Sequence, residues 1–474
     1  MQDESAACAD ERFRPFGERM RSVGMDKLVI EQFRRHYVQL LAGGTGLITR
    51  RQIDPLDEVP DLEQLDNYSP EGIRALDKVV VIKLNGGLGT GMGMERAKSL
   101  LEVKNNLSFL DIIARQVLHV RRAYNCRLPL ILMNSAGPRK ESCELLRRYP
   151  DLGGSIPPDF LQHSIPKIEQ GSLAPVSWPA HPAMEWCPPG HGDIYCALVT
   201  SGMLALLLAE GFEYAFVSNS DNLGAVMDVG ILGYCASLKI PLVMEVADRT
   251  EADRKGGHLA RAKNGTLVLR ELAQCPEEEK EMFQDISLYR YFNTNTLWLN
   301  LVALEKLLKK HGHVLPLPLI INSKTVDPRD AGSPAVYQLE TAMGSALSVF
   351  PGAAAVRVPR VRFAPVKACN DLLGLWSDAY VLTEDARLVQ NPGRRYGQIV
   401  IELDPRYYRH IDQMKARFRS GVPSLVDCEK LVVEGDVLFG GNVVMKGIVR
   451  ITNKSGRQMS ISDGRVLEGS VILN

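Results

Sequence analysis

The chain has 474 residues, enough for a large hydrophobic core and for two or three domains. Its 56 Lys and Arg residues balance its 56 Asp and Glu residues, so no overall charge would attract nucleic acid, and any phosphate binding must be local. Nine cysteines are scattered without a C-x-x-C pair, which argues against a disulfide framework or a zinc site and favours a reducing compartment.

The first 75 residues predict a helical extension and a connector. Apolar residues recur at helical spacing from Met25 to Leu41, and Gly43-Gly44 gives a helix-ending signal. We therefore expect one or two helices within residues 1–45, packed on the core. Residues 46–75 hold three prolines among many acids and indicate an extended connector.

The acidic N-terminus does not resemble a secretory signal, because Asp3 and Glu4 stand where such a signal is basic. No stretch of the sequence approaches the roughly 20 apolar residues of a membrane span. We therefore expect a cytoplasmic protein that does not bind membranes.

A strand and a glycine-rich loop lie between Val79 and Ser99, in the sequence VVVIKLNGGLGTGMGMERAKS. A run of β-branched residues that ends at glycine is typical of a buried parallel strand. Five glycines follow within residues 86–93, and a backbone without Cβ atoms lets N–H groups converge on phosphate oxygens. The pattern predicts a strand, a nucleotide-binding loop and then a helix, with Lys98 near phosphate charge.

This loop matches neither of two better-known phosphate-binding motifs. Lys98-Ser99 would fit the end of a Walker A loop, but Met92 and Ala97 hold its glycine positions. The dinucleotide pattern G-x-G-x-x-G fails because its third glycine would fall on Met92, Met94 or Arg96. A flexible turn is the alternative, and five glycines directly after a buried strand disfavour it.

Short apolar runs alternate with helical patterns from residue 76 onward. The runs at 78–84, 128–133, 214–218, 240–246 and 266–269 predict strands, and those at 107–123, 197–210 and 225–237 predict helices. This alternation indicates a doubly wound α/β sheet whose ligands bind at the carboxyl ends of the strands.

The composition changes after Pro392, and the last 50 residues are rich in Val, Ile and Gly. Gly435, Gly441 and Gly447 lie six residues apart, which is a weak hexapeptide period of the left-handed β-helix kind. A small β-solenoid is one interpretation, and a plain antiparallel β-ribbon is the other.

Two loops in the central part carry candidate functional groups. His191 lies between Gly190 and Gly192 after two prolines, which favours a ligand-contacting histidine over a merely hydrogen-bonded one. Asp221 follows the strand YAFVS, and a carboxylate at a strand end opposite a phosphate loop is a natural Mg²⁺ ligand. Its alternative role is that of a turn former or helix cap.

Three further segments are each consistent with a functional role and with an ordinary structural one. Residues 255–258, KGGH, look like an ordinary turn when taken alone. Residues 291–298, YFNTNTLW, hold amides suited to hydroxyl recognition, although an amide-rich turn is equally consistent. Lys367, in PRVRFAPVK, could meet the same phosphates as Lys98 or be a solvated charge.

Together these segments resemble the eukaryotic-type UTP–glucose-1-phosphate uridylyltransferases, or UDP-glucose pyrophosphorylases. The matching stretches are KLNGGLGTGMG, PPGHGDIY, FVSNSDNLGA, KGGHL, FNTNTLW, YQLETAMGSAL and PRVRFAPVK, in family order from about residue 80 to 380. The resemblance implies a Rossmann-like nucleotidyltransferase domain of the glycosyltransferase-A type at 76–392. The N-terminal extension would span 1–75, and a left-handed β-helix would span 393–474.

The resemblance also implies a role for each matching residue. Leu84, Asn85, Gly86 and Gly87 would hold uridine and triphosphate, and Gln162 with Gly190 would read the uracil, although the stretch DFLQHSIPKI matches the family more loosely. His191, Asn219, Gly257, Glu271 and Asn293 would surround glucose phosphate, with Ser220 and Asn222 also contacting substrate. Asp221 would bind Mg²⁺, while Lys98 and Lys367 would act catalytically by neutralising phosphate charge.

The reaction implied is reversible in-line attack of glucose 1-phosphate on the α-phosphate of UTP. Because the nucleophile is already an anion, catalysis needs positioning and charge stabilisation more than a base. One rival is a pyrophosphorylase with a broader sugar range, and another is a non-catalytic nucleotide-sugar binder. The chain would be a monomer or a homo-oligomer assembled through its C-terminal domain.

Overall fold

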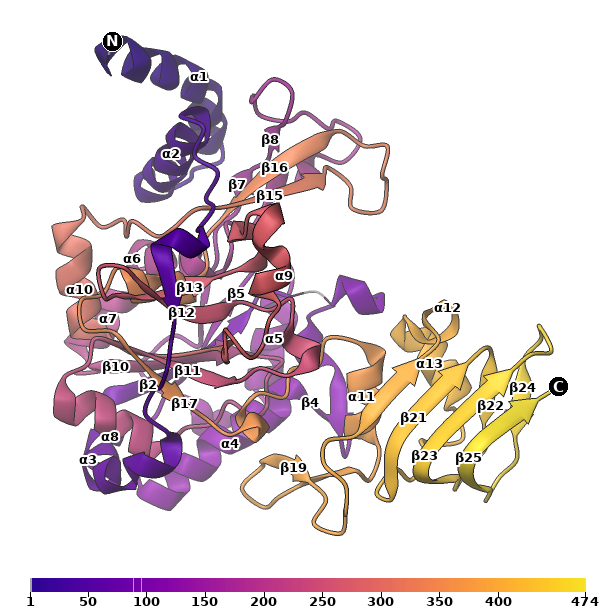
Figure 1. The fold of residues 1–474 in the computed structure, drawn as a ribbon. Helices are drawn as coiled ribbons and strands as arrows, with labels where there is room; N and C mark the ends of the chain where they lie inside the picture. The colour runs from indigo at the N-terminus through magenta and orange to yellow at the C-terminus, as the bar shows by residue number, and fades with distance from the viewer. Residues whose placement is uncertain (1, 88, 95) are drawn as a thin grey trace.

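A mixed β-sheet forms the centre of the molecule in the computed structural model, which describes residues 2–87, 89–94 and 96–474 (Figure 1). Four parallel neighbours run in the order β10 (Tyr214–Asn219), β2 (Val79–Asn85), β5 (Leu130–Asn134) and β6 (Asp159–Leu161). The antiparallel strand β14 (Tyr291–Asn300) extends the sheet beyond β10. The remaining strands of this sheet are β1 (Ile53–Pro55), β11 (Leu242–Asp248), β12 (His258–Ala262), β13 (Leu267–Arg270) and β17 (Ala354–Arg357).

Strand β2 is buried along its whole length because helices cover both faces of the sheet. Val79 and Val81 pack into a core with α4 (Phe109–Tyr124). Val80 and Ile82 pack into a second core with α6 (Ile194–Thr200), α7 (Met203–Ala209) and α10 (Leu301–Lys310). Successive residues of a strand point to opposite faces, so a continuous apolar run supplies both cores. This confirms the α/β architecture expected from the sequence.

The helix expected over 197–210 is two helices, α6 (Ile194–Thr200) and α7 (Met203–Ala209). Gly202 takes a positive φ of 73°, which ends the first helix and redirects the chain. No single helix in the described part of the chain is long and apolar enough to span a membrane; residues 191–200 and 203–209 pass that test only as a pair bent by 67°.

The helix expected directly after the glycine loop is absent from the described residues. Short 3₁₀ turns at Thr90–Met92 and Lys98–Leu100 lead instead into the ribbon β3 (Glu102–Lys104) and β4 (Leu107–Ser108). Helix α4 begins only at Phe109, where Ser108 and Asp111 form a reciprocal capping box. Lys98 therefore sits on a tight turn and not on a helix.

The N-terminal residues form the expected helical extension, α1 (Gln2–Ser22) and α2 (Lys27–Leu41), packed on the core. The connector predicted for 46–75 is wrong, because β1 joins the edge of the sheet beside β12 and α3 (Ser69–Ala75) packs on α8 (Val229–Leu238). Pro70 stands in the first turn of α3, where a missing N–H costs nothing. The prolines and acidic residues of the segment 46–75 gave no sign of this helix.

The C-terminal strands are stacked in parallel and lie beside the main body in Figure 1. Strands β20 (Val400–Leu403), β21 (Cys428–Glu434), β23 (Val444–Asn453) and β25 (Val466–Leu473) form one sheet, and β22 (Val437–Phe439) pairs with β24 (Met459–Ile461). The antiparallel-ribbon interpretation is therefore wrong. A sheet of parallel strands from successive chain segments is the pairing of a solenoid.

The other helices and strands complete the body around this frame. They are α5 (Arg139–Leu146), α9 (Lys280–Phe283), α11 (Cys369–Trp376), α12 (Pro405–Tyr408), α13 (Ile411–Arg417), β7 (Ile165–Pro166), β8 (Ile168–Glu169), β9 (Trp186–Cys187), β15 (Ile320–Thr325), β16 (Ala335–Glu340), β18 (Tyr380–Leu382) and β19 (Leu388–Gln390).

Candidate active site

The glycine loop and the end of β10 meet at an ion pair. Lys98 Nζ lies 2.6 Å from Asp221 Oδ2, and the two side chains are 14% and 22% exposed. Strands β2 and β10 are parallel neighbours with Leu84 opposite Asn219, so the loops that follow them leave the same edge of the sheet. The structure thus brings together two residues that the sequence separates widely.

Lys367 joins this edge from a third segment of the chain. The N–H of Val366 donates to the carbonyl of Asp221 at 3.4 Å, and Asn222 forms a β-bridge with Pro365. The Lys367 side chain is exposed, with Nζ 5.8 Å from the centre of the Phe363 ring. Its segment therefore contacts the Asp221 loop, and its exposed ammonium is available to an anionic ligand.

Asn222 fixes the segment that carries Lys367. Its side chain is buried, its amide donates to the carbonyl of Arg362 at 3.1 Å, and its Oδ1 accepts from the N–H of Ala364 at 3.0 Å. These polar atoms already bond to the protein. The Asn222 side chain thus holds the Lys367 segment in place.

A second buried group holds the start of the glycine loop. The Asn85 amide donates to Asn134 Oδ1 at 2.7 Å and to Ser142 Oγ at 2.9 Å. Its Oδ1 accepts from Ser220 Oγ at 3.2 Å. Asn85 and Ser220 are both buried, so their side chains lock the two strand ends together. Leu84 belongs to the core beneath them.

The residues expected to read uracil converge. Gln162 Nε2 donates to the carbonyl of Gly190 at 2.9 Å, and a Cβ at Gly86 would lie 2.9 Å from Gln162 Oε1. Gly190 has a φ of 78° and backs onto Thr341, where any side chain would collide with the backbone. Gly87 is exposed, and its carbonyl accepts from the N–H of Lys98 at 3.1 Å. The glycines at 86, 87 and 190 place no side chain at this position, which suits a planar base.

His191 enters the site as a neutral ring. Its Nδ1 accepts from the N–H of Met343 at 2.9 Å, so the proton of the neutral ring sits on Nε2. Burial lowers the pKa of His191 to about 4 because a charged imidazolium would lose its hydration. His191 therefore offers a hydrogen-bond donor near pH 7 and not a positive charge.

Gly257, Glu271 and Asn293 also come together, as the resemblance implied. A Cβ at Gly257 would lie 2.6 Å from the Glu271 carboxylate, and the N–H of Asn293 donates to the Gly257 carbonyl at 3.1 Å. Burial raises the pKa of Glu271, and a hydrogen bond from Asn293 partly offsets that effect. A carboxylate and an amide within hydrogen-bonding distance of each other match the hydroxyls of a sugar.

Residues 291–298 form most of strand β14, so their interpretation as an amide-rich turn is wrong. The strand carries an irregularity opposite Glu245 and Val246, where Asn295 takes a φ of 57°. This bulge turns the Asn295 amide toward Asn219, to whose Oδ1 it donates at 2.7 Å. It thereby orients the last residue of β10.

Sequence reasoning missed a buried charge cluster beneath the site. Arg362 Nη2 lies 2.6 Å from Glu245 Oε1, and Trp298 Nε1 donates to the same oxygen at 2.9 Å. Nearby, burial lowers the pKa of Lys83 to about 7, and Lys83 Nζ donates to Ser218 Oγ at 2.6 Å. The signal was a single charged residue within each otherwise apolar run, VVVIKLN and LVMEV.

Three potential metal ligands cluster elsewhere among the described residues. Atoms of His163, Asp193 and Cys196 lie within 4.8 Å of one another. His163 Nδ1 is 2.9 Å from Asp193 Oδ1, and burial strongly raises the pKa of Cys196. A protonated thiol is a poor metal ligand, so this cluster is a hydrogen-bonded support next to Gln162.

Comparisons with known proteins agree with this geometry. Residues 30–446 match the family model described as UTP--glucose-1-phosphate uridylyltransferase. The chain is 41% identical over 419 residues to the Solanum tuberosum enzyme of that name, covering 87% of this chain and 86% of the relative. It is 42% identical over 424 residues to the Hordeum vulgare enzyme, covering 88% and 87%.

Solved structures match over almost the whole chain. A UDP-glucose phosphorylase from Trypanosoma brucei is 43% identical with a TM-score of 0.88, covering 98% of this chain and 100% of that one. A mutant Leishmania major UDP-glucose pyrophosphorylase in complex with UDP-glucose is 42% identical with a TM-score of 0.89, covering 98% and 99%. The chain belongs to the UTP–glucose-1-phosphate uridylyltransferase family.

Proposed function

We propose that this protein makes UDP-glucose and pyrophosphate from UTP and glucose 1-phosphate, in a reversible reaction. The observation that carries the proposal is the meeting of Lys98, Asp221 and the Lys367 segment at one edge of the sheet. The glycines at 86, 87 and 190 and the group formed by Gly257, Glu271 and Asn293 complete the proposed site. One site therefore offers cations for phosphates, a surface for a base and acceptors for a sugar.

The chemical step needs two anions to approach in line. A phosphate oxygen of glucose 1-phosphate forms a bond to the α-phosphorus of UTP, and the bond from that phosphorus to the bridging oxygen of pyrophosphate breaks. Lys98 and Lys367 neutralise charge on the phosphates, while glycine-loop N–H groups hold them. His191 donates from Nε2 without adding a titratable charge near pH 7.

Asp221 fits the role of a Mg²⁺ ligand. Lys98 bonds to Oδ2, no described residue donates a hydrogen bond to Oδ1, and the carboxylate is partly exposed. Magnesium takes one or two protein carboxylates and fills its remaining positions with phosphates and water. When bound, the ion would supply positive charge to the phosphates; Asp221 would hold it, and Lys98 would sit beside it.

The finer description of the fold is also part of this proposal. Residues 76–392 would form a Rossmann-like glycosyltransferase-A domain, preceded by the extension at 1–75, and residues 393–474 a left-handed β-helix. In support of the β-helix, Leu431 pairs with Val449, eighteen residues further on, which is one turn of three hexapeptides. We place the protein in the cytoplasm, as a monomer or as an oligomer assembled through this C-terminal region.

The test is pyrophosphate release from UTP with a panel of sugar 1-phosphates at equal concentrations. We expect glucose 1-phosphate to give the highest kcat/KM. Comparable values for galactose 1-phosphate or N-acetylhexosamine phosphates would support the broader pyrophosphorylase instead. Nucleotide-sugar binding without any pyrophosphate release would overturn the proposed enzyme in favour of a binder.

A further inference from the structure

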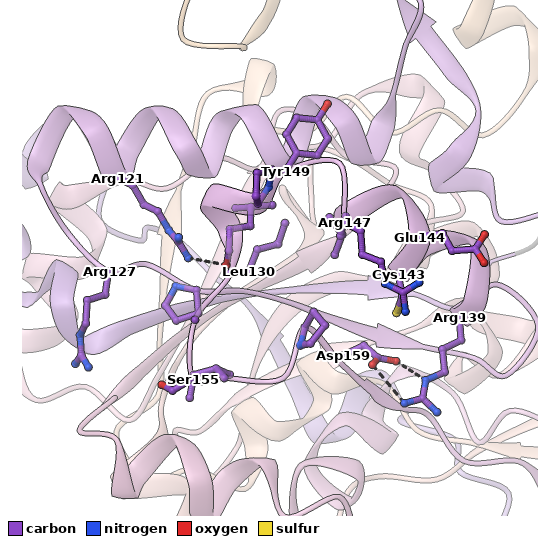
Figure 2. Close-up of a pocket in the computed structure, with 18 of the residues that line it drawn as sticks. Arg121, Arg127, Leu130, Arg139, Cys143, Glu144, Arg147, Tyr149, Ser155 and Asp159 are labelled. Carbon is purple, nitrogen blue, oxygen red and sulfur yellow. Dashed lines mark hydrogen bonds and ion pairs between the residues drawn. The ribbon is translucent and has the colours of Figure 1, made fainter.

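A large cavity lies behind the nucleotide loop, outside every site residue discussed so far. It has a volume of about 1030 Å³ and lies between α5, the end of α4 and the segment 150–158 that leads into the edge strand β6 (Figure 2). Sites for small molecules span about 300–1,000 Å³, so this cavity is large enough for one.

The lining combines positive charge with apolar and aromatic surface. Five basic residues face two acidic ones, Glu144 and Asp159, and Asp159 is already paired with Arg139 at 2.7 Å. The apolar part includes Leu130, Leu146, Ile156, Tyr149 and Phe212. A small organic anion with an apolar ring would match both parts.

The basic residues divide into structural and available ones. Arg121 donates to the backbone carbonyls of Leu128 and Asp151 and thereby anchors one wall. Figure 2 shows Arg121 at the left side of the cavity. Lys140 and Arg147 are exposed, and neither forms an ion pair within the described part of the chain. These two charges, at α5 and its C-terminal end, are free to meet an anion.

Helix α5 connects this cavity to the glycine loop. Ser142, on α5, accepts from the Asn85 amide at 2.9 Å, and Glu141 pairs with Arg96 at 3.1 Å. A second connection consists of two hydrogen bonds. The buried Asn134 amide donates to Asp159 Oδ2, on the cavity wall, at 3.1 Å, and Asn134 Oδ1 accepts from the Asn85 amide at 2.7 Å. A ligand that shifts α5 or draws Arg139 away from Asp159 would therefore act on the loop.

We propose that the cavity behind α5 binds a small organic anion carrying an apolar ring, and that occupancy changes the affinity of the nucleotide loop for UTP. The binding part stands by itself; the coupling part rests on the proposed function. Coupling between two sites is reciprocal, so UTP must change the affinity for the anion by the same factor. Two separate experiments keep the parts distinguishable.

The binding experiment uses 8-anilinonaphthalene-1-sulfonate, followed by fluorescence, with the full chain. We expect saturable binding of one probe per chain, and binding at least tenfold weaker for the neutral analogue N-phenyl-1-naphthylamine because it lacks the charge. The double variant Lys140→Glu with Arg147→Glu should bind the sulfonate probe with an affinity lower by about tenfold or more. Equal affinity for the two probes would overturn the anion assignment.

A pocket-filling variant locates the probe. Gly154 lines the cavity, and a Cβ there would meet nothing within 4 Å, so Gly154→Trp can project its ring into the space. Gly171 has the same open surroundings outside the cavity, which makes Gly171→Trp a matched control. We expect Gly154→Trp to abolish binding and the control to keep it. Equal binding to both variants would overturn the site.

The coupling experiment measures UTP affinity with and without saturating probe. We expect the dissociation constant for UTP to change by about fivefold and then to stay constant as the probe concentration rises further, as coupling between two sites requires. A dissociation constant that keeps rising with probe concentration would indicate direct competition and would overturn the separate site. Ser142→Ala removes the hydrogen bond between α5 and Asn85, so the probe should change the affinity for UTP by a factor closer to one. An unchanged UTP affinity would overturn the coupling while leaving the binding site intact.

Discussion

Lys98 Nζ and Asp221 Oδ2 lie 2.6 Å apart although 123 residues separate them in the chain. The contact exists because β2 and β10 are parallel neighbours and both loops leave the same edge of the sheet. A cation and a carboxylate in one partly open site can each serve phosphate chemistry, the first directly and the second through a metal ion.

Lys98→Ala and Lys367→Ala should each lower kcat by about 10²–10³-fold, because each removes a cation from charge that develops in the transition state. Lys367→Ala should not change the free energy of unfolding by more than about 1 kcal/mol, since the charge of an exposed side chain contributes little. Steady-state kinetics and urea unfolding measure the two effects. Lys324→Ala, on an exposed part of β15, is the control. Near-normal turnover in either variant would remove its catalytic role.

Asp221→Asn should weaken the dependence on Mg²⁺, because a neutral amide is a poorer ligand than a carboxylate for this ion. In a magnesium titration at fixed UTP, the half-saturating concentration should rise by tenfold or more, equivalent to about 1.4 kcal/mol. The rise in melting temperature caused by Mg²⁺ with UTP should shrink as well. The control Asp330→Asn, in an exposed turn, should change neither the magnesium titration nor the melting temperature. An unaltered titration would place the metal elsewhere.

Glu245→Gln should destabilise the fold strongly, because it removes the nearest counter-charge of the buried Arg362 guanidinium and leaves only Asp228 at 3.7 Å. Breaking a buried ion pair from one side costs about 3–5 kcal/mol. The exposed pair Lys263–Asp54 provides the comparison, and Asp54→Asn should cost about 0–1 kcal/mol. Urea midpoints of the two variants measure the difference. Similar midpoints would show that the buried pair contributes no more than a surface one.

Acid should destabilise the protein between pH 6.5 and about 4 through His191. Its pKa is lowered from 6.5 to about 4 by burial, so over this range the unfolded state binds more protons than the folded state. Stability therefore falls as pH decreases, by at most about 1.4 kcal/mol per pH unit for one histidine.

His191→Asn tests this pH dependence, because an amide oxygen can still accept from the N–H of Met343 but cannot titrate. The variant should lose less stability than the parent chain between pH 7 and pH 5, as measured by urea midpoints. His36 and His258, whose pKa values are also lowered by burial, remain in both proteins and cancel in the comparison. An equal loss in both would show that burial does not lower the pKa of His191 in the folded state.

The local patterns predicted the main elements well. Alternate residues of VVVIKLN enter two cores, as a continuous apolar run requires. The errors came where one residue type supports two structures. Pro70 marked a helix start and not a connector, and Asn295 belongs to a bulged strand and not to a turn.

The site residues likewise divide into those that local patterns predicted and those that depend on contacts across the fold. Residue type and spacing identified Lys98, Asp221 and His191 as candidates, because charge, glycine loops and strand ends are local properties. Whether a side chain faces a ligand or the protein depends on its neighbours across the sheet. The side chains of Asn85 and Asn222 bond to neighbouring segments of the chain, and Glu245 and Arg362 form a pair that no local pattern joins.

The sequence by itself determined the alternation of strands and helices, the phosphate-suited loop and the family to which the chain belongs. It did so because apolar periodicity and glycine placement act within a few residues. Only the tertiary structure decided that Lys98 meets Asp221, that His191 is a neutral donor and that a cavity lies behind α5. Those properties depend on burial and on contacts between segments far apart in the chain, which the packing of the sheet and its helices sets.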